Sequence, residues 1–131
     1  MREPDFEQDG WCLEDGEVLQ HESPETFWLP ELTERQSLQP GDLVKLIFRI
    51  SVDNEEQPVA VERMWVIVRE QVGEHYLGIL DNDPYAIKEN DEFGSGIELP
   101  FLPRHVIDID RADVSEASQP VPLPKRFWDH G

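Results

Sequence analysis

Two neighbouring stretches with alternating hydrophobic residues constrain the fold more than any other feature of the chain. In LVKLIFRI, residues 43–50, Lys45 and Arg49 lie on one face and hydrophobic residues lie on the other. VAVERMWVIVRE, residues 59–70, is longer, rich in β-branched residues and hydrophobic on both faces. A period of two residues predicts strands, and the second should be central and twisted. The residues expected on the inner faces are Val44, Leu46, Phe48, Ile50, Met64, Val66 and Val68.

Three shorter strands are expected further along, at residues 75–80, 96–101 and 104–110. Leu77 and Ile79 should point inward, and Val72-Gly73-Glu74 should turn the chain before them. Pro100 and Pro103 place the last two strands at an edge or a sharp corner, because proline cannot donate to a strand ladder. Ahead of the first long strand, QPGD is a turn in which Gly41 can take a positive φ.

The stretch between residues 23 and 38 predicts one or two short helices. Ser23-Pro24 has the residue types typical of a helix start. Pro30 prevents one continuous helix, so a second helix is expected from Pro30 to about Leu38. Phe27 and Trp28 are expected to pack this segment onto the sheet.

These elements predict an α+β fold built on a small, strongly bent antiparallel sheet, which could close into an SH3-like barrel. The 131 residues suit one domain. We expect an acidic, partly ordered segment at residues 1–22, the α+β domain at 23–111 and a proline-rich extended tail at 112–131.

Charge bounds the class of partner. The chain has 11 Lys and Arg against 29 Asp and Glu, which gives a formal net charge of −18. Such a surface repels nucleic acid and anionic lipid and attracts cations, so we expect no nucleic acid and no membrane as partners. The charge either serves solubility alone or recognises a basic protein. No oligomeric state is predicted.

The cellular compartment is expected to be the cytoplasm. Cys12 is the single cysteine, so no internal disulfide can form. No stretch approaches the roughly 20 apolar residues of a membrane span, and MREPDFEQDG contains no apolar core of a secretory signal.

The stretch LGILDNDPY raises the question of a metal or catalytic site. Asp81 and Asp83 flank Asn82 at the end of an expected strand, but the spacing does not match a calcium-binding loop. Asp and Asn before proline are typical of turns, because their side chains accept hydrogen bonds from nearby backbone amides. The pattern therefore favours a turn, and we expect no metal.

His105 is the best candidate among four histidines, whose spacing matches no zinc motif. A locally hydrogen-bonded histidine at a strand edge is the interpretation we favour.

Trp65 is expected in the core. No motif for a catalytic nucleophile, a phosphate loop, a dinucleotide or a zinc protease is present, so we expect no cofactor and no catalysis.

The sequence therefore leaves several hypotheses. One is a non-catalytic acidic binding protein with a ligand or partner site at Trp65, Asp81, Asn82, Asp83 and His105. Its rival is a small-ligand-binding or hydrolytic protein, for which Asp81, Asp83 and His105 must converge on one pocket. A third is an accessory domain that uses its aromatic tail. Phe127 and Trp128 either dock back on the domain, which we favour, or bind a partner.

Five segments resemble a family of small uncharacterised bacterial proteins, a domain of unknown function with relatives proposed as toxin-immunity proteins. The resemblance covers roughly residues 22–110 and implies a compact, cytosolic, bacterial protein, without catalytic residues to carry over. The segments are SPETFWLP, the stretch from ER to PGDLVKLIFRI, ERMWVIV, YLGILDNDPY and FLPRHVIDID. The matching residues are Pro24, Phe27, Gly41, Asp42, Trp65, Gly78, Asp81, Asn82, Pro84, His105 and Ile107.

Overall fold

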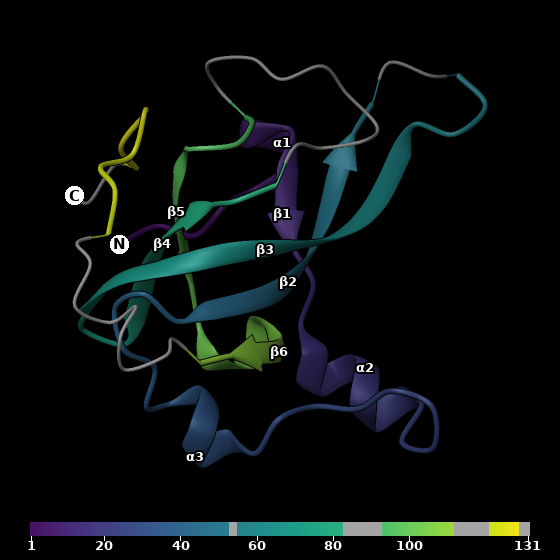
Figure 1. Cartoon of the computed structure of the whole chain (residues 1–131). Helices are drawn as coiled ribbons and strands as arrows, with labels where there is room; N and C mark the ends of the chain where they lie inside the picture. Colours follow the sequence, from purple (N-terminus) through teal and green to yellow (C-terminus); the bar gives the residue numbers. More distant parts are fainter. Residues whose placement is uncertain (53–54, 83–92, 112–120, 129–131) are drawn as a thin grey trace.

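The computed structural model describes residues 1–52, 55–82, 93–111 and 121–128 and confirms the α+β class. Six antiparallel strands form one sheet that curls into a half-barrel, with short helices around it (Figure 1). The strands are β1 (Trp11–Leu13), β2 (Leu43–Ser51), β3 (Val59–Val72), β4 (His75–Leu80), β5 (Glu98–Phe101) and β6 (Val106–Asp110). The helices are α1 (Phe6–Asp9), α2 (Gly16–Glu22), α3 (Leu32–Arg35) and the 3-10 turn η1 (Pro103–His105).

The sheet is built around β2, which has partners along both edges. One edge pairs with β3 over its whole length, and the other is shared by β1 and β6. The first part of β3 pairs with β2 and its last part pairs with β4, with an irregularity between Val68 and Glu70. β5 follows on β4. The long β3 therefore belongs to both halves of the sheet, as expected for a central, twisted strand.

Gly78 permits the close approach of β3 and β4. A Cβ atom at this position would lie 2.4 Å from Val66 Cγ1 and 2.8 Å from the Ile67 carbonyl oxygen. No side chain fits there without a backbone shift, so glycine is required by packing. Gly41 has a φ of 96°, which confirms the predicted turn before β2.

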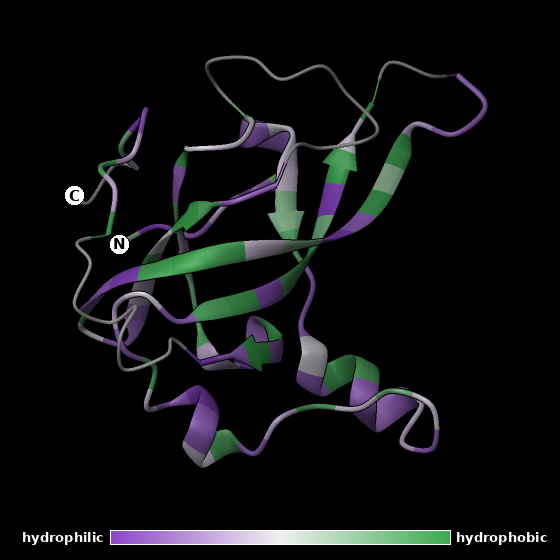
Figure 2. Ribbon diagram, in the orientation of Figure 1, coloured by the Kyte–Doolittle hydropathy of each residue, from purple (hydrophilic) through white to green (hydrophobic). Residues whose placement is uncertain are grey.

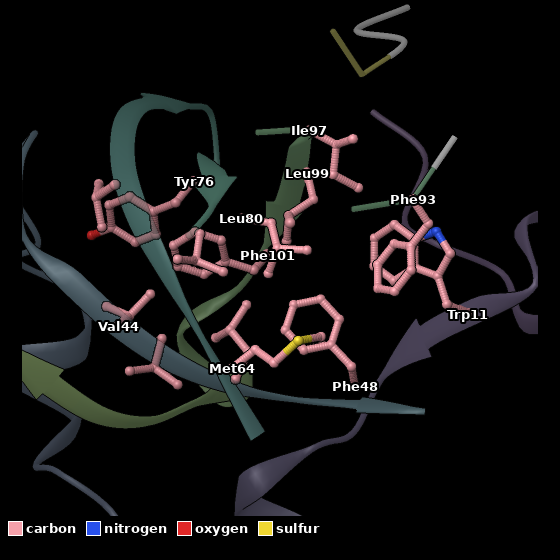
Figure 3. Close-up of a cluster of buried hydrophobic side chains, with 14 of the residues drawn as sticks. Trp11, Val44, Phe48, Met64, Tyr76, Leu80, Phe93, Ile97, Leu99 and Phe101 are labelled. Atoms are coloured by element: carbon pink, nitrogen blue, oxygen red, sulfur yellow. The ribbon is translucent and has the colours of Figure 1, made fainter. Parts of the chain in front are cut away.

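The main hydrophobic cluster fills the concave side of the sheet (Figure 3). The alternation predicted for β2 and β3 is confirmed, because all seven inner-face residues are buried in it. Trp11 stacks on Phe93 with ring centroids 5.1 Å apart, and Tyr76 stacks on Phe101 at 5.5 Å. In Figure 2 the hydrophobic colour follows β2 and β3 through the middle of the molecule.

On β4 the expected inner face is only partly correct. Leu77 and Ile79 are buried, but Tyr76 and Leu80 are the residues that join the main cluster. Both faces of β4 are covered, so alternation could not distinguish them.

A small second cluster covers the opposite face of β2. Leu29, Ile47 and Ile107 form it, and Leu19 and Phe27 pack against it. The expectation that Trp28 also packs onto the sheet is wrong, since its side chain is 85% exposed. Phe27 and Trp28 are adjacent, and only the first turns toward the cluster.

The helices differ from those predicted. The helix start at Ser23 is wrong, because Ser23 instead ends α2, its N–H donating to the Leu19 carbonyl. The Asp15 carboxylate caps the start of α2 by accepting from the Glu17 and Val18 amides. The helix predicted from Pro30 to Leu38 exists only as α3. The sequence analysis predicts none of α1, β1 and α2, which lie in the segment expected to be only partly ordered.

Arg35 connects two of these helices, α2 and α3, to the turn η1. Its buried side chain donates from Nε to the Pro30 carbonyl, and from Nη1 to Glu17 Oε2 at 2.8 Å and to the Pro103 carbonyl at 3.0 Å. One guanidinium thus connects α3, α2 and η1, which explains why short helices are held in place.

Candidate functional site

The carboxylate-rich stretch after β4 extends the sheet. The Asp81 N–H donates to the Trp65 carbonyl at 2.9 Å, and the Trp65 N–H donates to Asn82 Oδ1 at 2.6 Å. The Asn82 side chain thus takes the place that a backbone carbonyl would have in a longer strand. This is side-chain chemistry typical of a turn, and it occupies the amide oxygen that a ligand site would need.

Asp81 is exposed at this end of the sheet, and Asp83 lies outside the described residues. Among the residues that the structure describes, no group of three or more His, Cys, Asp and Glu could hold a metal ion.

Trp65 lies at the surface, in contrast to its expected place in the core. It is half-buried on the convex face of β3, and the Lys45 Nζ lies 4.8 Å from its ring centroid. Lys45 lies directly opposite Trp65 on the neighbouring strand β2, so the two side chains form a cation–π pair. The indole face is therefore already covered by a cation of the same molecule.

His105 ends η1 and is buried. Its Nδ1 accepts from the Leu102 N–H at 2.9 Å, and its Nε2 lies 3.9 Å from Glu3 Oε1. Burial, with a smaller contribution from the Arg104 charge, lowers the pKa of His105 to about 4. The imidazole is therefore neutral near pH 7 and shapes the corner between β5 and β6.

The structure does not bring His105 and Asp81 together. His105 accepts from the Leu102 N–H, and Leu102 follows the Phe101 that pairs with Tyr76 near the start of β4, whereas Asp81 follows the last residue of β4. Six strand residues separate these two ends, a span of roughly 17–20 Å. Asp81 and His105 thus lie near opposite ends of β4, whereas Asp83, which the small-ligand or hydrolytic hypothesis also requires, lies outside the described residues.

Cys12 does not form a reactive thiolate. Its thiol is half-buried in β1, and burial raises its pKa, with Glu14 adding to the effect.

Residues 125 and 126 lie beside the chain at the start of β5. The Lys125 N–H donates to the Gly96 carbonyl, and the Glu98 N–H donates to the Arg126 carbonyl, both at 2.8 Å. Ile97 and Arg126 form a parallel bridge. These bonds satisfy backbone groups that an edge strand would expose.

Trp128 reaches the main cluster, whereas Phe127 does not. The Trp128 ring packs edge-on against Trp11 at 5.9 Å, its Nε1 donates to the Arg2 carbonyl, and Arg2 lies over its ring at 4.4 Å. Phe127 is more than half exposed beside Arg69. The two aromatic residues therefore have different roles, one internal and one at the surface.

The buried carboxylate of Glu98 joins Arg69 to the backbone of Trp128. Glu98 Oε2 accepts from Arg69 Nη1 at 2.7 Å, and Oε1 accepts from the Trp128 N–H at 3.1 Å. Its side chain is fully buried, and these two hydrogen bonds compensate its oxygens for the loss of water. Sequence reasoning missed Glu98, because nothing in GIELPF distinguishes a buried glutamate from a surface one.

The arginines of the chain are largely engaged internally. Among the described residues, six of them form ion pairs: Arg2, Arg35, Arg49, Arg69, Arg104 and Arg111. Arg63 lies over the Phe27 ring. The positive charges thus neutralise part of the protein's own acidic groups, and the excess of carboxylates faces solvent.

No helix in the described residues is long and apolar enough to cross a membrane. No family model matches the chain, and comparison with curated proteins and with solved structures finds no match.

Proposed function

We propose that this protein is a non-catalytic binding protein whose acidic exterior recognises a basic protein in the cytoplasm. The observation that carries the proposal is the distribution of charge. The formal charge is −18, and seven of the eight arginines lie in ion pairs with the chain's own carboxylates or over an aromatic ring. The surface charge that remains available to an external partner is therefore negative. Complementary charge accelerates association and selects against acidic partners.

The local structure supports a binding role over a catalytic one. The candidate residues after β4 complete the strand pairing through Asn82, and His105 holds the Leu102 amide. Both side chains thus act on the backbone of the fold. A chemical role would need a polar group directed at a substrate position.

A narrower form of the proposal is toxin immunity. The resemblance of SPETFWLP, ERMWVIV and FLPRHVIDID to relatives of proposed immunity proteins supports it, and an acidic face could cover the basic active site of a nuclease. A gene for a basic toxin beside the gene for this chain would favour immunity over other roles.

The test is capture of the partner at low ionic strength. The tagged full-length chain is exposed to extract of its native host, and the captured proteins are identified and purified. We expect a protein with net positive charge that binds the purified chain directly and is released by salt. A captured partner that is neutral or acidic, or recovery of no direct partner at low salt, would contradict the proposal.

The tail allows a control within the same experiment. Phe127 is exposed, so Phe127→Ala leaves the fold unchanged. If capture depends on Phe127, the accessory-domain hypothesis is favoured. We expect capture to be unaffected, because the proposal assigns recognition to charge.

A further inference from the structure

The most exposed tryptophan of the described chain stands at the edge of an acidic cleft. Trp28, Pro30, Glu34, Ile107, Asp108 and Ile109 line a cleft of about 330 Å³, called here the Trp28 cleft. It lies between the segment that leads into α3 and the outer strand β6, which are neighbours in Figure 1. We propose that the Trp28 cleft binds an arginine-bearing segment of the basic partner; this inference rests on the proposed function.

Exposure is the first argument. Trp28 is 85% exposed, whereas its neighbours Phe27 and Leu29 pack in the small cluster under β2. Leaving an indole in water forgoes a hydrophobic stabilisation that a partner could recover. Tryptophan is also enriched among residues that dominate binding energy at protein interfaces.

The composition of the cleft identifies what fits it. Pro30, Ile107 and Ile109 supply apolar side chains to the lining, and Glu34 and Asp108 supply carboxylates. A combination of apolar and polar groups matches the general anatomy of protein interfaces. The occupant should therefore combine aliphatic side chains with cationic ones.

Charge around the cleft favours a cation. Glu31 and Asp110, which follow the lining residues Pro30 and Ile109 in sequence, are also exposed. The described cations near the cleft have partners within the chain. Arg111 bonds Asp42 and the Glu34 and Ser37 carbonyls, and Lys45 lies over the Trp65 ring. Arg35 bonds the Pro30 carbonyl and pairs with Glu17, and Arg63 lies over the Phe27 ring. The net field at the cleft is therefore negative, which disfavours an anionic lipid, a nucleic acid or a second copy of this acidic chain.

Arginine fits better than lysine for a geometric reason. A guanidinium can stack flat on the Trp28 indole while its edge donates to a carboxylate, a combination that an ammonium cannot achieve. The docking uses side chains and not strand addition, because the Ile109 N–H is taken by Asp108 Oδ1 at 2.9 Å.

The test is titration of the isotopically labelled full-length chain with defined peptides at low ionic strength. The probe is a blocked peptide of alternating Arg and Leu, and matched peptides carry Lys or Glu in place of Arg. We expect the Trp28 indole N–H and the amides of residues 107–109 to shift with the Arg peptide. The Lys peptide should bind several-fold more weakly, and the Glu peptide should not bind.

Variants then separate the cleft from charge in general. Trp28→Ala should weaken binding of the Arg peptide at least tenfold, with circular dichroism unchanged because the side chain makes little internal contact. The pair Glu34→Gln with Asp108→Asn should weaken binding more than the control pair Glu7→Gln with Glu74→Gln. Both pairs change the net charge equally, and all four carboxylates are exposed.

The outcomes distinguish the two proposals. If the Arg peptide binds, but Trp28→Ala has no effect and both pairs weaken it equally, recognition is spread over the surface. The cleft proposal is then wrong, while the proposed function stands. If neither cationic peptide binds at low salt, the cleft proposal and the charge-based function both fail.

Discussion

At the scale of single residues, Asn82 decides how the carboxylate-rich stretch after β4 is understood. Its Oδ1 accepts from the Trp65 N–H, so it supports the backbone of a strand 17 residues away in sequence. Asp81 beside it is exposed and contributes its backbone N–H. We therefore expect substitution of Asn82 to lower the stability of the fold and substitution of Asp81 to change it little.

We predict that Asn82→Ala lowers the free energy of unfolding by about 1–2 kcal/mol, because the Trp65 N–H loses its acceptor. Asn82→Asp should cost less, since a carboxylate still accepts, and Asp81→Asn should change stability by under about 0.5 kcal/mol. Urea unfolding followed by tryptophan fluorescence measures all three. Equal stability of wild type and Asn82→Ala would show that the Asn82 side chain does not stabilise the fold.

His105 gives a prediction for pH. Its pKa is about 4 in the folded chain against an ordinary value of 6.5, so the unfolded chain binds the proton more readily. The stability that neutral His105 contributes is therefore present above pH 6.5 and is lost as the pH falls toward 4. The groups around it are Arg104, Asp15, His75 and Glu3.

The comparison is with His105→Gln, which keeps a side-chain acceptor but does not titrate. Between pH 7 and pH 4, wild type should lose up to roughly 3 kcal/mol more stability than the variant. Parallel stability profiles for the two proteins over this range would show that His105 is not held neutral by burial.

At the scale of elements, the sequence predicted strands better than helices. The alternation in β2 and β3 is a local pattern that burial of one face imposes directly, and both strands were found where expected. α2 and α3 are short and mostly polar, and β1 has only three residues. Distant partners hold all three: Arg35 for the two helices and the edge of β2 for β1. A local pattern contains no sign of such partners.

The candidate site shows the same limit. The turn after β4 and the local hydrogen bond of His105 follow from the preferences of Asp, Asn and His, and these interpretations could be made from the sequence. The exposure of Trp28 beside the buried Phe27, and the burial of Glu98, depend on how separate segments pack. The identity of an aromatic residue in the sequence does not indicate whether its side chain is buried or exposed.

The tail yields a prediction at this scale. Trp128→Ala removes the edge-on contact with Trp11 and the cation–π contact with Arg2, so it should destabilise the chain by about 2 kcal/mol. Phe127→Ala is the matched control and should cost under about 0.5 kcal/mol, because Phe127 is exposed. Denaturant midpoints give both values. Similar losses for the two variants would mean that the tail does not dock through Trp128.

At the scale of the whole molecule, the excess of 29 acidic over 11 basic residues makes the protein strongly negative around a hydrophobic, half-barrel core. A surface of this kind acts at a distance of about one Debye length, roughly 8–10 Å at moderate salt. The long-range field governs how fast a partner arrives, and short-range contacts such as those of the Trp28 cleft govern how long it stays.

The most direct measurement of this account is the association rate constant of the chain with its captured partner as a function of ionic strength. We predict a fall of at least about tenfold between roughly 20 mM and 200 mM salt, with a much smaller change in the dissociation rate. An association rate that stays constant over this range would contradict the claim that the negative exterior recognises the partner.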